Sequence, residues 1–120
     1  MIKFKSLNKS KQFLSILKKK KITNKYFVMY FDKNPKKNEK EINRILNISF
    51  VMKKKIGNAV IRNKIKRKLK SAIRNSLQKK HSIDLNYTYV IFGKNNVYKD
   101  KFELILNEVN KTFKKINSYK

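Results

Sequence analysis

The chemistry that this sequence can perform is concentrated in one basic stretch, KKKIGNAVIRNKIKRKLKSAIR, at residues 53–74. The stretch lies inside residues 42–83, which contain no acidic residue. It also holds three of the four arginines of the chain, Arg62, Arg67 and Arg74. A guanidinium group pairs with phosphate through two parallel N–H bonds and stacks on bases, whereas the lysine ammonium acts as a point charge. The stretch therefore indicates phosphate binding in which geometry matters as well as charge.

The whole chain has a formal net charge of +26, from 33 basic and 7 acidic residues. Charge of one sign at this density repels itself in a compact fold, so we expect a polyanionic partner that neutralises it. Residues 1–31 are also free of acidic residues, which gather at residues 32–41 and 84–108. This segregation indicates one basic surface. Nucleic acid is the expected partner, because its phosphates attract clustered lysine and arginine.

Side chains for protein-based catalysis are scarce. Acid–base cleavage of a phosphodiester needs paired groups of suitable pKa, and the single histidine, His81, lies in a predicted loop where we expect a solvated residue. Asp100 and Glu103 could share a helix face, but the helix dipole explains acidic residues near a helix start without a metal ion. There is no cysteine, which excludes disulfides and thiolate metal sites. We expect no catalytic side chain, and no metal ion bound by the isolated protein.

The length of 120 residues predicts one domain, an RNA-binding domain over residues 1–120. Eight Phe and six Tyr, with 40% hydrophobic residues, indicate a folded core rather than a disordered basic tail. The longest apolar run, residues 26–31, is too short to span a bilayer, and residues 1–13 lack the apolar segment of a secretory signal. We therefore expect a cytoplasmic protein without a membrane partner.

The periodicity of apolar side chains predicts the element that positions the basic stretch. Ile56-Gly57-Asn58 is suited to a tight turn, and a helix is expected over residues 59–79. At about 100° per residue, one outward face of this helix carries Asn63, Arg67, Lys70 and Arg74. The inward stripe is Ile61, Ile65, Leu69, Ala72, Ile73 and Ser76.

The other predicted elements complete an α+β sandwich. Strands are expected at residues 26–31, 45–52 and 87–92, and helices at residues 9–20 and 99–116. The order α-β-β-α-β-α predicts a small, mostly antiparallel sheet packed on one face by helices. Two strands joined by a loop, here residues 32–44, most simply pair antiparallel.

The polar face of this sheet is a second candidate binding surface. Side-chain alternation places Tyr26, Tyr30, Asn47 and Ser49 on it, beside Phe13 of the first helix. Exposed aromatic side chains on such a face can stack unpaired bases, an interaction worth about 1–3 kcal/mol per base. The alternative is that these aromatic side chains belong to the core.

The residues of the basic stretch resemble those of a known family. KKIGNAVIRNKIKRKLKSAIR, residues 54–74, is similar to the signature of the bacterial ribonuclease P protein subunit, in which a Lys-Lys-hydrophobic-Gly-Asn-Ala-Val segment leads into an Arg-Asn-Arg-x-x-Lys-Arg-like helix. NKYFVMY and YVIF extend the likeness over nearly the whole chain. Lys64 stands where the family usually has its second Arg, Leu17 where a second cleft Phe is common, and Lys53 where a small polar residue is usual. The loop at residues 32–44 looks lengthened.

The resemblance implies a ribonucleoprotein that removes the 5′ leader from precursor tRNA, with the chemistry carried out by the RNA subunit. The implied partners are ribonuclease P RNA and precursor tRNA, with no obligate protein partner, and Mg²⁺ bound mainly by RNA. A left-handed strand-helix-strand crossover at the basic helix is also implied, against the general right-handed rule. The residues implied for the catalytic RNA and nearby phosphates are Lys54, Lys55, Asn58, Arg62, Asn63, Lys64, Lys66, Arg67, Lys70 and Arg74. Those implied for the leader-binding cleft are Phe13, Leu17, Tyr26, Tyr30, Asn47 and Ser49.

Two other classes of function share the charge and size of this chain. One is a ribosomal or other structural RNA-binding protein, and the other is a nucleoid protein that coats duplex DNA. Ribosomal proteins often carry extended basic tails, whereas the basic density here lies in a predicted helix with an apolar face. Stimulation of leader removal by a catalytic RNA would distinguish these classes.

Overall fold

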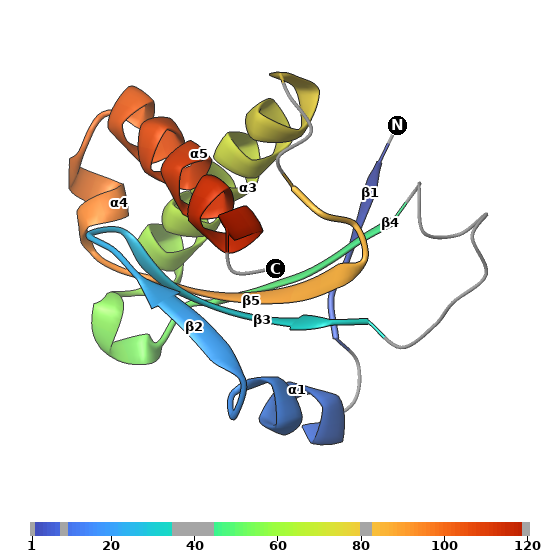
Figure 1. Cartoon of the computed structure of the whole chain (residues 1–120). Helices are drawn as coiled ribbons and strands as arrows, with labels where there is room; N and C mark the ends of the chain where they lie inside the picture. Colours follow the sequence, from blue (N-terminus) through green and yellow to red (C-terminus); the bar gives the residue numbers. More distant parts are fainter. Residues whose placement is uncertain (1, 8–9, 35–44, 80–82, 119–120) are drawn as a thin grey trace.

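A computed structural model of the chain describes residues 2–7, 10–34, 45–79 and 83–118 (Figure 1). In chain order its elements are strand β1 (Lys3–Lys5), helix α1 (Ser10–Ile16), strands β2 (Lys20–Thr23), β3 (Phe27–Lys33) and β4 (Ile45–Val51), the 3-10 turn η1 (Lys54–Ile56), helix α3 (Ala59–Lys79), strand β5 (Tyr87–Gly93), and helices α4 (Asn96–Lys99) and α5 (Phe102–Ser118). Most of the predicted loop at residues 32–44, and His81, fall outside the described residues. Within the described part, no helix has the length and apolar character needed to cross a membrane.

The strands form one mixed sheet in the order β1-β4-β5-β3-β2. β4 pairs parallel with both β1 and β5, whereas β3 pairs antiparallel with β5 and β2. The α+β class is confirmed, but the predicted antiparallel pairing of residues 26–31 with residues 45–52 is wrong, because β5 lies between them. Tyr89, Val90 and Ile91 are all fully buried, so β5 is apolar on both faces and is suited to the centre of the sheet.

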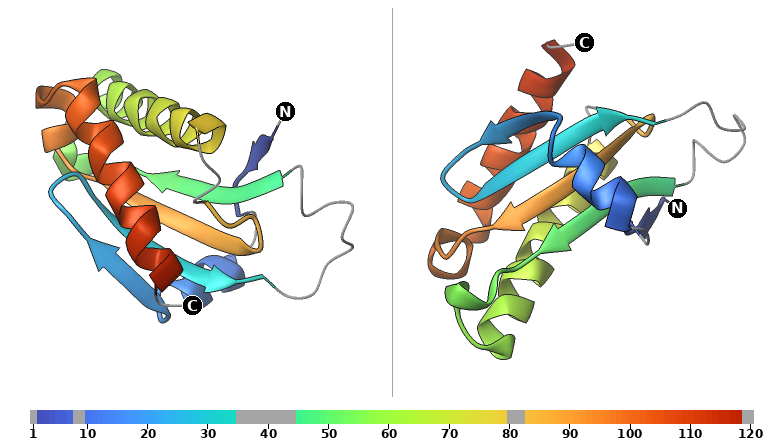
Figure 2. Two further views of the ribbon diagram at one scale, coloured as in Figure 1. Left: turned by 45° about the horizontal axis from the view of Figure 1, so that its top comes forward. Right: turned by 90° about the horizontal axis from the view of Figure 1, so that it is seen from below.

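The connection from β4 through α3 to β5 is a left-handed crossover. The left panel of Figure 2 shows the sheet with α3 and α5 toward the viewer and with β4 and β5 both pointing to the left. β5 lies below β4 in that view, so it would lie to the left of β4 if both strands pointed up. A right-handed crossover would place it on the other side. The arrangement agrees with the crossover that the family resemblance implied.

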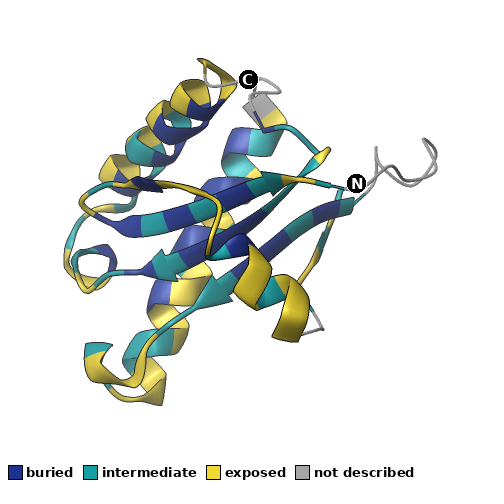
Figure 3. Ribbon diagram, turned by 60° about the horizontal axis from the view of Figure 1, so that its bottom comes forward, coloured by how far each residue is buried: buried dark blue, intermediate teal, exposed yellow. Residues whose placement is uncertain are grey.

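The hydrophobic core lies between the sheet and the two long helices. The predicted inward stripe of α3 is confirmed for Ile65, Leu69 and Ile73, which are fully buried, whereas Ile61 at the start of the helix is only half-buried. Fully buried residues of α5 and of the sheet complete the core, among them Ile105, Val109, Phe113, Ile116, Phe27, Met29, Leu46 and Ile91. The short helix α1 lies across the opposite face of the sheet (Figure 3), so the helices do not all pack on one face.

The sequence did not predict β1, β2 or α4. The predicted helix over residues 9–20 ends at Ile16, and Lys20 already belongs to β2. β1 and β2 are short edge strands rich in lysine, so their composition is that of an exposed turn, and only pairing with β4 and β3 makes them strands. The predicted final helix over residues 99–116 is confirmed as α5, which begins slightly later, at Phe102, because the chain bends at Asp100 after α4.

Candidate nucleic-acid interface

The turn before α3 sets the direction of the basic helix. Gly57 has φ +157°, a conformation that side-chain-bearing residues rarely adopt, and a Cβ added there would lie 3.2 Å from Ile61. Asn58 follows as the helix cap: its Oδ1 accepts a hydrogen bond from the backbone N–H of Ile61 at 3.0 Å. The side-chain oxygen of Asn58 is thus occupied by the helix, which leaves its amide nitrogen for a partner.

The residues of the turn and helix that were predicted to bind RNA all lie at the surface. Arg62 and Lys70 are half-buried, and the others are exposed. The exposed members are Lys54, Lys55, Asn58, Asn63, Lys64, Lys66, Arg67 and Arg74. The apolar stripe of α3 faces the sheet and α5, so these side chains point away from the core. The structure therefore brings the residues of the helix together as one basic surface, which we call the α3 surface together with the turn that precedes it; from that turn, Lys55 also lines a hollow beside Phe92.

Aromatic rings hold several of these cations in place. The guanidinium carbon of Arg74 lies 4.3 Å from the ring centroid of Phe4, and the Lys70 ammonium lies 5.9 Å from that of Phe50. The two rings are themselves stacked at 6.3 Å. On the other side of the helix, the Lys64 ammonium lies 5.7 Å from the ring centroid of Tyr98. Cations above aromatic faces lose some side-chain freedom before any ligand binds.

Arg62 has an unused donor. Its Nε is buried and has no hydrogen-bond partner within the described residues. Together with Asn63 and Lys66, it lines a hollow of about 300 Å³ beside the end of β4. With an arginine and a lysine in its lining, this hollow is suited to an acceptor such as a phosphate oxygen.

Three aromatic rings lie together on the face of the sheet crossed by α1, which we call the open face. The ring centroids of Phe13 and Phe92 are 6.3 Å apart, and those of Tyr30 and Phe92 are 5.7 Å apart. Lysine ammonium groups lie beside two of the rings, Lys53 at 5.5 Å from Phe92 and Lys21 at 5.9 Å from Tyr30. Phe13, Tyr30 and Phe92 are all half-buried, so their rings remain partly accessible. Stacking of bases beside charge-neutralised phosphates is possible here.

Phe92 was missed by the sequence analysis. The signal for it was present, because side-chain alternation along β5 places Phe92 on the face opposite the buried Tyr89 and Ile91.

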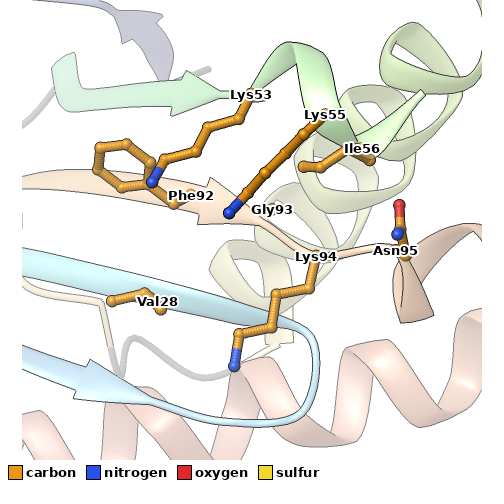
Figure 4. Close-up of a pocket in the computed structure, with 8 residues that line it drawn as sticks. All are labelled: Val28, Lys53, Lys55, Ile56, Phe92, Gly93, Lys94 and Asn95. Atoms are coloured by element: carbon orange, nitrogen blue, oxygen red, sulfur yellow. The ribbon is translucent and has the colours of Figure 1, made fainter. Parts of the chain in front are cut away.

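Two hollows flank the three rings. Figure 4 shows the first, of about 420 Å³, in which the side chains of Lys53 and Lys55 extend over β5 from the turn before α3. Its lining is Val28, Lys53, Lys55, Ile56, Phe92, Gly93, Lys94 and Asn95. The second, of about 300 Å³, follows the edge of β4 beyond its pairing with β1. It reaches from the open face to the α3 surface, with the lining Phe4, Ser6, Leu7, Phe13, Ile48, Ser49, Phe50, Lys66 and Lys70.

The predicted position of Tyr26 on the open face is wrong. Tyr26 is only 4% exposed and belongs to the core, and its hydroxyl donates a hydrogen bond to Asp100 Oδ2 at 2.6 Å. The alternation that placed it on the open face does not apply, because β3 begins one residue later, at Phe27. The bond to Asp100 raises the pKa of Tyr26 to about 12.

The other predicted cleft residues lie at or near the open face. Ser49 lines the second hollow but is buried, and its hydroxyl accepts a hydrogen bond from the backbone N–H of Leu7 at 2.9 Å. Asn47 is half-buried on the same side of β4, by alternation with Ser49. Leu17 is half-buried just after the end of α1. Ser49 thus holds the segment leading to α1 in place.

Within the described residues, the acidic side chains are dispersed. Asp100 accepts the hydrogen bond from Tyr26 and pairs with Lys25 at 3.1 Å, and both partners hold the pKa of its carboxyl below the usual range. Across the residues that the structure describes, no three His, Asp or Glu side chains are grouped so that they could hold a metal ion.

Comparison with known proteins gives a consistent result. A family model described as Ribonuclease P matches residues 1–117. The ribonuclease P protein component of Mesoplasma florum is 32% identical over 108 residues, which cover 89% of this chain and 90% of the relative. That of Carboxydothermus hydrogenoformans is 31% identical over 110 residues, with coverages of 91% and 88%. The solved RNase P protein from Thermotoga maritima aligns with a TM-score of 0.71 at 25% identity, and covers 92% of this chain and 96% of its own.

Proposed function

Because the chain belongs to the ribonuclease P protein family, we propose that it binds the catalytic RNA through the α3 surface and the 5′ leader of precursor tRNA on the open face. Membership makes it the protein component of an endoribonuclease complex that processes the 5′ end of tRNA, with ribonuclease P RNA as its partner. In this assignment the RNA subunit breaks the phosphodiester bond. The protein contributes binding energy and positioning.

The observation that carries the proposal is the presence of two different surfaces on either side of β4. The α3 surface is rich in cations and suits a folded RNA, whose backbone phosphates dominate binding. The open face has accessible rings at Phe13, Tyr30 and Phe92, and rings of this kind bind unpaired bases. A protein that holds a folded RNA and a single strand at once fits the removal of an unpaired leader beside a catalytic RNA.

Phosphate neutralisation would also assist the metal requirement of the reaction. Lysine and arginine close to the scissile bond reduce repulsion between the two RNAs, so less Mg²⁺ is needed to bring them together. Mg²⁺ itself is proposed to be bound mainly by RNA. The Asp100 carboxylate, between α4 and α5, already accepts a hydrogen bond from Tyr26 and pairs with Lys25. Assembly in the cytoplasm, where precursor tRNA is made, is part of the same proposal.

Reconstitution tests the assignment. The purified protein is mixed with a bacterial ribonuclease P RNA and precursor tRNA at low Mg²⁺, and leader removal is followed over time. We expect faster cleavage than with the RNA alone, and no cleavage by the protein without RNA. A binding titration of the reconstituted complex with mature tRNA gives the part of the affinity that does not depend on the leader.

The opposite result would favour a structural RNA-binding protein. In that case the protein would not accelerate leader removal, would bind ribosomal RNA tightly, and would bind precursor and mature tRNA equally. Cleavage at the correct phosphate by the protein without RNA would contradict the assignment of catalysis to the RNA subunit.

A further inference from the structure

We propose that Lys18, Lys19 and Lys21 extend the leader cleft past Tyr30 and bind phosphates of the upstream part of a single-stranded 5′ leader. This inference rests on the proposed function, since it assigns a longer path to the same RNA strand. Binding at these lysines depends on leader length and not on leader sequence, because an ammonium group contacts phosphate as a point charge.

The lysines belong to a structured segment between α1 and β2. The backbone N–H groups of Lys18 and Lys19 donate hydrogen bonds to the carbonyl oxygens of Ser15 and Ile16, at 3.1 and 3.0 Å. These bonds continue α1, so the turn is held at the end of the helix that crosses the open face (Figure 2, right panel). Both side chains are exposed, and residues 1–31 contain no acidic residue that could neutralise them locally.

Strand pairing separates Lys21 from its neighbour Lys20. Lys21 pairs with Tyr30 and Lys20 pairs with Phe31. Tyr30 is on the open face, where the Lys21 ammonium lies 5.9 Å from its ring centroid. Phe31 and Ile22 belong to the core on the other face, and alternation therefore directs Lys20 away from the open face although both lysines are exposed. Lys20 and Lys21, although adjacent in the chain and equally charged, thus lie on opposite faces of the sheet.

The aromatic rings and flanking cations form a continuous path across the sheet. From the turn before α3, the path passes from Lys53 to Phe92, then to Tyr30 and to Lys21, with separations of 5.5, 5.7 and 5.9 Å. Phe13 lies beside the path at 6.3 Å from Phe92. Each ring offers a stacking surface and each end offers a cation, which is the combination that binds single strands without sequence preference.

The order of the strands gives the path a direction. β4 leads into the turn and α3, where the catalytic RNA is proposed to dock, whereas β2 is the sheet edge farthest from it on the β3 side. The scissile bond of the precursor tRNA is held at the catalytic RNA during cleavage. The leader nucleotides next to that bond are therefore nearest to β4 and β5. Nucleotides farther upstream reach β3 and then β2. Lys18, Lys19 and Lys21 are therefore placed for the upstream phosphates.

The test compares leaders that lengthen one nucleotide at a time, bound to the reconstituted complex of protein and catalytic RNA. The variants are Lys21→Gln and the triple variant Lys18→Gln, Lys19→Gln, Lys21→Gln, with Lys20→Gln as the matched control in the same strand. With wild-type protein and with Lys20→Gln, affinity should rise with leader length and then level off. With the triple variant it should level off at a shorter leader, with long-leader affinity lower by on the order of tenfold at moderate salt.

Salt dependence gives a second readout, which a purely structural role of Lys21 would not change. Loss of three single-strand phosphate contacts should reduce the slope of log affinity against log salt by about 2 for long leaders, and leave the slope for short leaders unchanged. Lys21→Gln alone should show about a third of this change. Thermal unfolding of each variant identifies any loss of folding.

Several results would overturn the inference. One such result is a triple variant whose affinity depends on leader length as the wild type's does. Another is that Lys20→Gln lowers the affinity for substrates with long leaders as much as Lys21→Gln does, because only a general effect of net charge would then explain both losses. Weaker docking of the catalytic RNA itself in the triple variant would assign these lysines to that RNA. If the wild-type complex shows no preference for a leader at all, the proposed function fails as well, so the two failures are distinguishable.

Discussion

Arg74, in the C-terminal half of α3, rests on Phe4 of the N-terminal strand, with its guanidinium carbon 4.3 Å from the ring centroid. Phe4 is held by β1, which pairs with β4, and by stacking on Phe50. At this distance the planar guanidinium can lie over the ring while its N–H groups remain available to a phosphate. The N-terminal strand therefore helps to orient a cation of the α3 surface.

Loss of this contact should weaken docking of the catalytic RNA. Phe4→Leu keeps an apolar side chain and removes the ring, and Arg74→Lys keeps the charge and removes the planar group. Each should reduce binding by about 0.5–1 kcal/mol, the strength of an exposed cation–π contact. Because both act on one contact, the double variant should bind no more weakly than the weaker single variant. Additive losses in a titration with the catalytic RNA would contradict the coupling.

Removal of two arginines from the α3 surface should lower the salt dependence of assembly. In Arg62→Ala with Arg67→Ala, two phosphate contacts are lost, so the slope of log affinity against log salt should fall by about 2 if the contacts are to paired RNA. The matched control is Lys111→Ala with Lys114→Ala, which removes the same charge from the exposed side of α5. An equal change in slope in the control would mean that only net charge matters.

Changes to the aromatic rings of the open face should affect substrates that carry a leader. Phe13→Leu, Tyr30→Leu or Phe92→Leu should each weaken precursor tRNA binding by about 1–3 kcal/mol for a stacked base, and leave mature tRNA binding unchanged. Tyr26→Phe is the control, because Tyr26 lies in the core and not on this face. Equal losses for both tRNAs, or a fall in thermal stability that accounts for the loss, would show that the rings serve the core.

Substitution of Gly57 should destabilise the turn before α3. Gly57→Ala places a Cβ at a φ of +157° and 3.2 Å from Ile61, and we expect a loss of about 1–3 kcal/mol in the free energy of unfolding. Asn58→Ala, which removes the helix cap, should cost about 1 kcal/mol. Urea unfolding measures both values. A Gly57→Ala protein as stable as the wild type would mean that the turn relaxes without strain.

The contact between Tyr26 and Asp100 should be visible in the pH dependence of stability. The folded-state pKa of Asp100 is below its usual 3.8, so its contribution is present above pH 3.8 and is lost as the pH falls toward the folded value. Tyr26 titrates at about 12 instead of 10, so its contribution is present below pH 10 and is lost as the pH rises toward 12. Tyr26→Phe should raise the pKa of Asp100, and it should reduce the loss of stability at both acid and alkaline pH. An Asp100 pKa that is unchanged in an NMR titration of this variant would contradict the assignment.

Repeating apolar patterns explain which parts of the fold could be predicted. The 21-residue helix α3 and its stripe of Ile65, Leu69 and Ile73 follow from a period of 3.6 residues, and β4 follows from alternation. These elements bury one face each, so their own residues carry the signal. β1 and β2 lack such a signal, because short segments of three or four residues with two lysines each become strands only when a partner supplies the hydrogen bonds.

The residues of the candidate site also differ in whether the sequence around them carries a signal for their position. The basic residues of α3 could be assigned because charges on a helix repeat with its geometry. Tyr26 was misplaced because one residue decides where β3 begins, and pairing with β5 sets that start at Phe27. The face that carries Phe92 follows from local alternation along β5, but its partial exposure depends on what covers that face in the folded chain.

The sequence by itself determined the basic residues of the α3 surface, the position of the Gly57 turn and the apolar face of the helix that follows. Only the tertiary structure decided that β5 separates β3 from β4, that Phe92 joins Phe13 and Tyr30, and that Lys21 faces the open side while Lys20 does not. Local backbone preferences and apolar periods act over a few residues, whereas strand order and shared faces depend on contacts between distant segments that form only in the folded chain.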